Sequence, residues 1–363
     1  MEQMIRIRRG KVSRILGSHE GLTEIEVEVD GAKHKAVNLD ALTGPVTEGS
    51  EVVLNTTATA LGLGSGGYDF VIFVVGNDHL NAVAPGHIIK LRYTPLQVKC
   101  LSVEEQDSPY HQAVKNFKSL AGMPVIVGSL HSMLAPAVVA LKAAGRKPLK
   151  VAYVMTDGAA LPIAFSRTVR ELKAGGFLAG AVTVGHAFGG DLEAVNKHSG
   201  LIAAREALEA DVAVVTMGPG IVGTGTKYGN TALEQGEIVD AVDLLGGRAI
   251  AIPRLSFADP RPRHKGVSHH FLTALGEVAR SRAVIAMPKL DPDLYKLITE
   301  QLTQFGVMAR HQVETVDVDF LPGALQKAGI TVSSMGRGYE EDPAFFKAAA
   351  AAGVIAAQMV NLS

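Results

Sequence analysis

The sequence has little cysteine, few aromatic residues and almost no net charge. Its single cysteine, Cys100, excludes an intrachain disulfide and fits a reducing cytosol. It contains no tryptophan and only 5% aromatic residues, which argues against stacking platforms for nucleic-acid bases. The 35 basic and 36 acidic residues nearly balance, so no global field attracts nucleic acid or an anionic membrane.

Signals for export or membrane insertion are also missing. The N-terminal residues MEQMIRIRRGK contain no apolar core of signal-peptide length. No uncharged apolar run approaches the ~18 residues that a membrane-spanning helix needs. We therefore expect a cytoplasmic protein that does not enter a membrane.

The pattern of apolar residues changes near residue 100, which predicts two domains, residues 1–100 and 101–363. In the first, short β-type segments alternate with turn signals, and residues 23–29 alternate in strict period two. This pattern is typical of a small all-β barrel or sandwich.

In the second domain, continuous apolar strands alternate with helical patterns. Strands without polar alternation, separated by amphipathic helices, indicate a sheet that is covered on both faces. We therefore predict an α/β fold with a doubly wound, mostly parallel, Rossmann-like sheet. Its strands are expected at 123–128, 149–156, 176–185, 211–217, 248–255 and 282–288, and more weakly at 313–318 and 330–333.

Polar residues directly follow several of these strands. In a parallel sheet such turns open on one edge, where open α/β sheets bind ligands. We therefore predict one shared crevice. Its expected ligand-binding segments are Ser129, His131, Asp157, His186, a glycine loop (residues 218–231), an Arg/His segment (residues 256–270) and Arg337.

The Arg/His segment reads SFADPRPRHKGVSHH and joins a strand to a helical pattern. Arg261 and Arg263 are separated by a proline that stiffens the backbone, so we predict that they clamp a phosphate or carboxylate. A solvated loop is the simpler alternative for these two arginines.

The same segment carries the predicted catalytic residues, Asp259, His264, His269 and His270. The histidines flank an expected helix start. There the helix dipole disfavours the imidazolium ion and leaves a neutral imidazole that can accept a proton.

The glycine loop imitates two nucleotide-binding motifs without satisfying either. Residues 218–223 match GxGxxG, but the capping signal of Thr231 with Glu234 places the helix too late for a dinucleotide fingerprint. Lys227 lacks the Gly-Lys-Ser/Thr context of a phosphate-binding P-loop. What remains is an exposed loop that could wrap an anion, through Gly220, Gly223, Thr224, Thr226 and Lys227.

A metal site made of His186, Asp191, His264 and His269 is an alternative use of the same crevice. Adjacent His269 and His270 would point about 100° apart on a helix, so we do not expect one ion to take both. Asp191 is more simply interpreted as a helix N-cap. The sequence leaves the metal and the cofactor unspecified.

The basic N-terminal residues Arg6, Arg8 and Arg14 raise the alternative of nucleic-acid binding. A charged edge strand that resists aggregation explains them equally well, and the acidic residues of 24–28 could neutralise that face. We therefore expect no nucleic-acid partner.

Four motifs together resemble a bacterial family of unknown function. They are GSLHSM (128–133), MGPGIVGTGTKYGNT (217–231), ADPRPRHKGVSHH (258–270) and SSMGRGYEEDPAFF (333–346). The resemblance implies that the motifs belong together, and it implies no activity.

The residues favour an enzyme that acts on a small anionic molecule, phosphorylated or nucleotide-like, bound by arginines and Lys227. A non-catalytic ligand sensor and an NAD(P)-dependent oxidoreductase are the alternatives. The expected partners are this anionic ligand and further copies of the chain.

Overall fold

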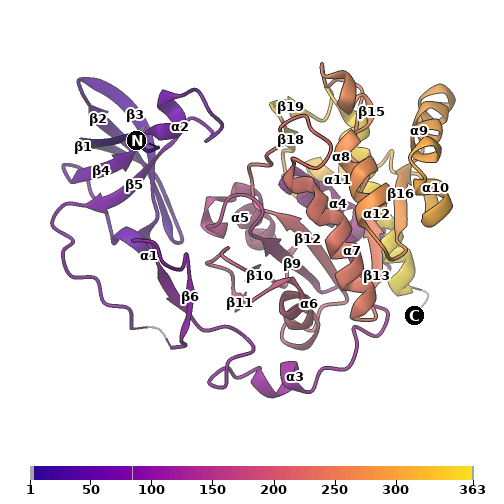
Figure 1. The fold of residues 1–363 in the computed structure, drawn as a ribbon, viewed down its shortest axis with the longest axis horizontal. Helices are drawn as coiled ribbons and strands as arrows, with labels where there is room; N and C mark the ends of the chain where they lie inside the picture. The colour runs from indigo at the N-terminus through magenta and orange to yellow at the C-terminus, as the bar shows by residue number, and fades with distance from the viewer. Residues whose placement is uncertain (1–3, 84, 362–363) are drawn as a thin grey trace. The chain divides into compact units, whose positions relative to one another are not determined.

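The computed structural model describes residues 4–83 and 85–361. Its internal contacts divide the chain into two compact units, Met1–Cys100 and Leu101–Ser363. Figure 1 shows a β-rich first unit and a second unit in which helices surround a sheet.

The first unit is a closed five-stranded barrel with the strand order β1-β2-β3-β5-β4. The strands are β1 (Ile7–His19), β2 (Leu22–Val29), β3 (Ala32–Asn38), β4 (Glu51–Asn55) and β5 (Asp69–Val74). Only β3 and β5 pair in parallel, as in small Greek-key barrels of the OB type. The alternation of β2 turns Ile25, Val27 and Val29 into the barrel core, which confirms the predicted barrel.

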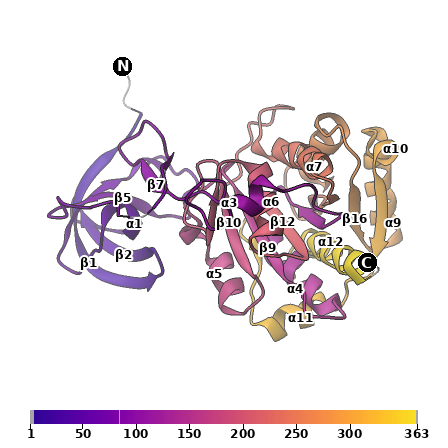
Figure 2. The same cartoon turned by 90° about the horizontal axis from the view of Figure 1, so that it is seen from below.

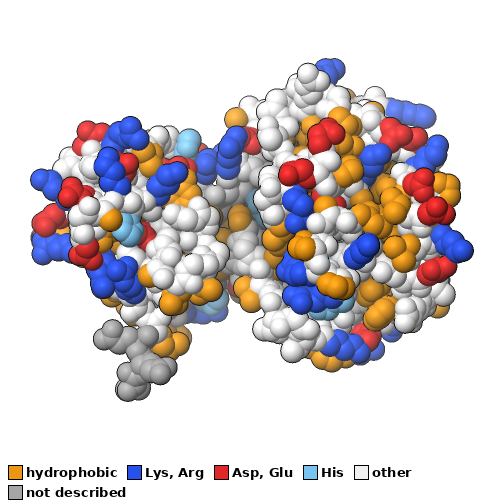
Figure 3. Space-filling view, turned by 90° about the horizontal axis from the view of Figure 1, so that it is seen from above, with side chains coloured by type: hydrophobic (Ala, Val, Ile, Leu, Met, Phe, Trp, Pro, Cys, Tyr) orange, Lys and Arg blue, Asp and Glu red, His pale blue; other side chains and the backbone are white. Residues whose placement is uncertain are grey.

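Short elements accompany the barrel. Helices α1 (Asp40–Thr43) and α2 (Thr57–Ala60) lie in its connections, and β6 (Ile88–Lys90) pairs with β7 (Val98–Cys100) in a separate hairpin. Two of the basic residues of β1 are paired with acids: Arg8 with Asp30 at 3.2 Å and Arg9 with Glu51 at 2.7 Å. On the face of the protein in Figure 3, basic and acidic side chains are interspersed.

The second unit is built on an eight-stranded sheet in the order β11-β10-β9-β12-β8-β13-β16-β17, in which every pairing is parallel. This confirms the predicted Rossmann-like α/β fold. The strands are β8 (Pro124–Val127), β9 (Val151–Thr156), β10 (Gly180–Val184), β11 (Leu192–Ala194), β12 (Val212–Met217), β13 (Arg248–Ala251), β16 (Val284–Pro288) and β17 (Gln312–Val316).

Two local predictions are wrong. Residues 191–194 do not begin a helix: Leu192–Ala194 is β11, and the helix starts later, behind a capping box made by Asn196 and Ser199. The weak strand at 330–333 is not part of the sheet either. Instead β18 (Ser333–Ser334) and β19 (Arg337–Gly338) form a two-stranded hairpin, and β14 (Leu255–Ser256) and β15 (Gly266–Val267) form another.

Helices cover both faces of the sheet, and Figure 2 shows α4 and α11 on one side and α6 and α7 on the other. The helices are α3 (His111–Lys115), α4 (Leu134–Ala144), α5 (Arg167–Ala174), α6 (Lys197–Glu206), α7 (Glu234–Leu244), α8 (His269–Thr273), α9 (Pro292–Gln304), α10 (Val307–Arg310), α11 (Leu321–Ala328) and α12 (Pro343–Asn361). Short 3-10 turns precede α4, α5, α7 and the β15 strand, and a π-helical turn follows α8.

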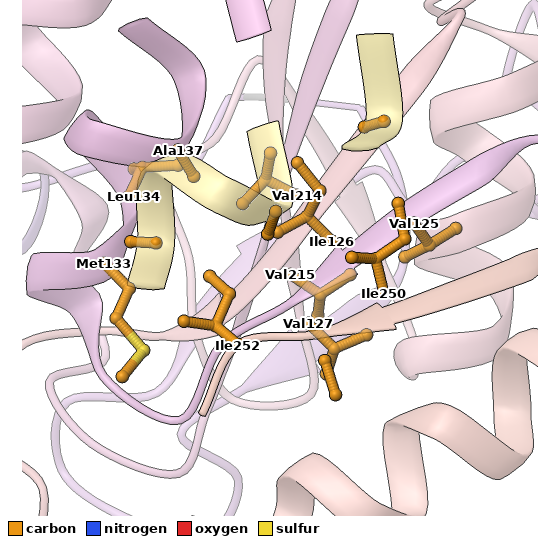
Figure 4. Packing of buried hydrophobic residues seen from close by; sticks show 14 of the residues in the cluster. Val125, Ile126, Val127, Met133, Leu134, Ala137, Val214, Val215, Ile250 and Ile252 are labelled. Atoms are coloured by element: carbon orange, nitrogen blue, oxygen red, sulfur yellow. The ribbon is translucent and has the colours of Figure 1, made fainter. Parts of the chain in front are cut away.

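The core lies where the central strands meet α4 and α12. Figure 4 shows Val125, Ile126 and Val127 of β8 packed beside residues of β12 and β13, with Met133 and Leu134 to their left. All of these side chains are buried. Full burial of such a side chain contributes roughly 1.5–3 kcal/mol, so this layer fixes the strand ends that carry the polar turns.

Helix α12 is the core helix of this unit. By length and composition it could cross a membrane, but 78% of its apolar stretch is buried within the protein, and it packs on α4 and on β16. Gly353 allows this contact, because a Cβ atom there would lie 2.1 Å from the Ala137 carbonyl oxygen. Pro343 is the first residue of the helix, where proline is tolerated.

The strand order creates a switch point beside the predicted crevice. From β8 the chain proceeds to β9, β10 and β11 on one side, whereas from β12 it proceeds to β13, β16 and β17 on the other. Neighbouring strands β8 and β12 therefore lead to opposite halves of the sheet. Open α/β sheets bind ligands at the carboxyl ends of the strands around such a point.

Candidate functional site

Three imidazoles gather after β13 on the Arg/His segment. His264 ends the 3-10 turn Pro262–His264, and His269 and His270 begin α8. The ring centroids lie 4.3 Å apart for His269 and His270, 5.0 Å for His264 and His270, and 5.2 Å for His264 and His269. We call these three side chains the imidazole cluster.

The imidazole cluster is neutral at physiological pH. Burial, reinforced by the guanidinium of Arg254, lowers the pKa of His264 to about 3. Burial and then the neighbouring His269 lower the pKa of His270 to about 3. The pKa of half-buried His269 is also lowered, first by burial and then by Arg263. Each ring therefore offers a lone pair for accepting a proton or for binding a cation.

The Asp259 carboxylate lies at the centre of three arginines. Arg261 donates to it through Nε at 2.9 Å and Nη2 at 2.8 Å. Nη2 of Arg254 lies 3.5 Å from Oδ2 of Asp259, and Nη2 of Arg337 lies 3.7 Å from the same oxygen. We call Arg254, Arg261 and Arg337 the guanidinium cluster.

These contacts decide the charge of Asp259. Hydrogen bonds from Arg261 hold the pKa of this carboxyl group far below its ordinary value, although burial acts against them. Asp259 is therefore an anion that orients arginines, and it has no proton to donate at neutral pH. A direct catalytic role for Asp259 stays a prediction.

A second buried carboxylate extends the network to the C-terminal part of the chain. Asp342 accepts a hydrogen bond from Ser256 Oγ at 2.6 Å, and Arg337 Nε lies 3.4 Å from its Oδ2. Arg337 thus bridges Asp342 and Asp259, which ties the β18-β19 hairpin to the Arg/His segment. The Oγ atoms of Ser132 and Ser334 lie 3.0 Å apart and connect the same hairpin to the turn after β8.

The glycine loop packs directly on the Arg/His segment. A Cβ atom on Gly223 would lie 2.9 Å from Cε1 and 3.1 Å from Nε2 of His270, so only glycine fits against this ring. A Cβ atom on Gly225 would lie 3.4 Å from Nη1 of Arg263. The structure therefore brings together residues that lie 38 positions (Gly225 and Arg263) and 47 positions (Gly223 and His270) apart in the sequence.

The polar groups of the glycine loop are partly engaged. The hydroxyls of Thr224 and Thr226 lie 2.9 Å apart, and Thr224 donates to the Gly229 carbonyl. Lys227 Nζ lies 2.6 Å from Glu277, which raises the pKa of the lysine. Gly220 is exposed with φ of +108°, a conformation that favours glycine. Because α7 begins only at Glu234, the loop lacks the helix start of a dinucleotide-binding fingerprint.

The remaining predicted residues form two other groups. His131 is buried, with Nε2 2.6 Å from Ser166 Oγ and Nδ1 3.1 Å from the Tyr153 hydroxyl. Burial lowers the pKa of His131 to about 4, and both of its nitrogens are satisfied. Nearby in sequence, the Ser129 hydroxyl is buried and has no partner among the described residues.

Asp157 and His186 belong to the other half of the sheet. The Asp157 carboxylate accepts a hydrogen bond from the His186 backbone N–H at 2.8 Å. Three strands separate β10 from β13, which at ~4.8 Å per step places their ends roughly 19 Å apart. His186 and the Arg/His segment therefore share the sheet edge without sharing one cluster.

The four-residue metal site of the sequence interpretation is wrong. Asp191 accepts from Lys173 at 2.6 Å and from the Ala181 backbone at 2.8 Å, and it lies on the β11 side with His186. The geometry permits what the sequence interpretation did not expect, namely that His269 and His270 share an ion. One nitrogen from each ring of the imidazole cluster lies within 4.8 Å of the others.

Sequence reasoning did not include Arg254 and Asp342 in this site, and it included Ser256 and Ser268 only as members of the Arg/His segment, without a role. Arg254 is only 3% exposed, and burial lowers its pKa to about 10, so it is a charge that needs a fixed partner. Arg254 lies in a strand-like apolar run and matches no sequence motif that would mark it as functional. Ser268 lay between two conspicuous histidines, and its Oγ lies 2.7 Å from His264 Nδ1.

Together the fold and the site define a two-unit protein, with a five-stranded barrel before a Rossmann-like unit that gathers arginines and imidazoles at its switch point. The chain belongs to the family described as protein of unknown function (DUF3866), which matches residues 35–353. This confirms the resemblance to a family of unknown function. A search of curated proteins finds no match to the chain.

Proposed function

We propose that the α/β unit binds a small anionic molecule, phosphorylated or nucleotide-like, between the glycine loop and the Arg/His segment, and that the imidazole cluster acts on it. The observation that carries this proposal is the close approach of Gly223 to His270 and of Gly225 to Arg263 within one loop. An anion in that place would meet a guanidinium and backbone N–H groups together.

The charges of the site favour an anion. The three arginines of the guanidinium cluster contact the carboxylates of Asp259 and Asp342. With Arg263 added, the site has four arginines and two carboxylates, an excess of two positive charges. Among the described residues, no carboxylate pairs with Arg263, which is exposed. Arg261 is 44% exposed, so its outer face also remains accessible to a ligand.

Enzymatic use of the site is favoured over ligand sensing by the three neutral imidazoles. A binding site needs the guanidinium groups only, whereas neutral rings beside a bound anion can donate a hydrogen bond to it or hold a metal ion that activates water. The late start of α7 argues against the oxidoreductase alternative. A cytoplasmic location and self-association stay predictions.

A second basic pocket provides a natural comparison. A cavity of about 320 Å³ at the amino ends of β13, β16 and β17 is lined by Arg248, Arg282, Arg310 and His311. Both nitrogens of His311 are engaged, one with the Leu275 carbonyl and one with the Ala283 N–H. This pocket offers arginines but lies at the opposite ends of the strands from the glycine loop and the imidazole cluster, so it serves as the control for nonspecific anion binding.

Replacing Arg263 with alanine should raise the Kd for inorganic pyrophosphate roughly 10- to 100-fold. This increase corresponds to the loss of the binding free energy of one charge-assisted hydrogen bond. The matched variant Arg282→Ala should change that Kd less than about twofold. Calorimetric titration of the metal-free full-length protein measures both constants. The melting temperature of each variant should stay near that of the parent, because exposed arginines contribute little to stability.

Two results would contradict the proposal. One is an unchanged pyrophosphate affinity in Arg263→Ala, and the other is a larger loss in Arg282→Ala. Unfolding of Arg263→Ala would instead show that this arginine is structural.

A further inference from the structure

The imidazole cluster has the composition of a transition-metal site. One ring nitrogen from each of His264, His269 and His270 lies within 4.8 Å of the other two. Two of the rings are buried and the third is half-buried. Three imidazoles with a fourth position free for water or substrate are a known ligand set of catalytic Zn²⁺.

Unsatisfied nitrogens point to a missing ligand. Among the described residues, His269 Nε2 and His270 Nδ1 are buried and have no hydrogen-bond partner. A buried polar atom without a partner costs roughly 1–3 kcal/mol, so two neighbouring ones need an explanation. A single cation bound to both rings would provide it.

The ring of His264 is held as a metal ligand usually is. Its Nδ1 lies 2.7 Å from Ser268 Oγ, and this contact fixes the orientation of the ring and leaves Nε2 to face away from the serine. Ser268 also accepts the backbone N–H of His270 at 3.3 Å, so one hydroxyl fixes the geometry of two members of the cluster.

We propose that His264, His269 and His270 bind one divalent transition-metal ion of the zinc class, through one nitrogen each, with a fourth coordination position left for water or an anion. Zn–N bonds of about 2.0–2.1 Å require the nitrogens to approach to roughly 3.4 Å, which side-chain rotation can supply. Imidazole ligands favour Zn²⁺, Co²⁺ or Ni²⁺ over Mg²⁺ and Ca²⁺, which prefer oxygen.

The arginines around this site couple metal binding to anion binding. Arg254, Arg261 and Arg263 all act electrostatically on the imidazole cluster, and they repel a dication. An anion bound beside Arg263 would relieve that repulsion. Since coupling between two ligands is reciprocal, each should strengthen the binding of the other. This coupling rests on the proposed anion site, whereas metal binding itself does not.

The test uses the full-length protein after treatment with a chelator and titration with Zn²⁺ alone, followed by calorimetry. We expect one Zn²⁺ per chain and a loss of Zn²⁺ affinity of at least tenfold in His269→Ala. His269 is chosen because its side chain is half-buried, so its removal should disturb the fold less than removal of either buried histidine. Co²⁺ should give the absorption bands of a four-coordinate ion. Mg²⁺ should not bind.

His198→Ala is the matched control, because His198 is a half-buried histidine on α6 outside the cluster. Its Zn²⁺ affinity should equal that of the parent protein. Absence of Zn²⁺ binding by the folded parent, or equal affinity in His269→Ala and the parent, would overturn the metal site.

Sulfate separates this inference from the proposed function. Sulfate should tighten Zn²⁺ binding roughly three- to tenfold in the parent protein, through the charge that it adds near the ion. In Arg263→Ala, Zn²⁺ without sulfate should bind more tightly than in the parent, and sulfate should have little effect. If neither sulfate nor Arg263→Ala changed the Zn²⁺ affinity, the anion site would be refuted and the metal site would stand. If Arg263→Ala weakened pyrophosphate binding but the parent protein bound no Zn²⁺, the metal site would be refuted and the anion site would stand.

Discussion

Replacing Asp259 with asparagine should lower the free energy of unfolding of the α/β unit by about 3–5 kcal/mol, the usual cost of removing one partner of a buried ion pair. The Asp259 side chain has no exposed surface, and that of Arg254 is 4% exposed. Asparagine keeps the shape of aspartate but removes its charge. The guanidinium of Arg254 would then be buried beside two further arginines without its nearest anion.

Urea unfolding followed by circular dichroism measures this effect, because the longer helices all lie in the α/β unit. Asp317→Asn is the matched control. Asp317 forms an exposed pair with Lys289 at 3.9 Å, and such pairs contribute at most about 1 kcal/mol. Equal stability of Asp259→Asn and the parent would show that Asp259 does not hold the guanidinium cluster.

Replacing Gly223 with valine should lower the affinity for inorganic pyrophosphate by at least roughly tenfold while leaving the melting temperature nearly unchanged. A Cβ atom at this position would approach the His270 ring to 2.9 Å, and this ring is only 5% exposed and cannot easily yield. The glycine loop must therefore lift away from the Arg/His segment. Because the loop is exposed, its displacement costs little of the core.

Gly64→Val is the control for this experiment. Gly64 is also an exposed loop glycine, and a Cβ atom there would meet no atom within 4 Å. Its pyrophosphate affinity should equal that of the parent. If Gly223→Val bound pyrophosphate as tightly as Gly64→Val, the contact between the glycine loop and His270 would have no part in ligand binding.

The strands of the α/β unit were predictable because buried parallel strands are continuous apolar runs. Runs such as VAYVMT at β9 and VAVVTM at β12 are short and rich in valine, which favours buried strands over helices. The short edge strand β11 was missed because Asp191 is also a good helix cap, and only the tertiary fold directs its carboxylate to Lys173. Local signals thus failed where a long-range partner decided the conformation.

Part of the candidate site was predicted from the sequence and part of it was not. The Arg/His segment and the glycine loop stand out by composition, and parallel topology places both on one edge of the sheet. The separation of His186 from them depends on strand order, which no local pattern carries. Arg254 was not assigned to the site, because its pairing with Asp259 becomes evident only once the chain turns back between β14 and β15.

The most direct test of the account is amide hydrogen exchange, measured by mass spectrometry with and without inorganic pyrophosphate. If the glycine loop and the Arg/His segment form one anion site, then pyrophosphate should slow exchange in peptides from residues 218–231 and 256–270 together. Protection confined to the pocket of Arg248, Arg282 and Arg310, or protection of only one of the two segments, would contradict the central claim.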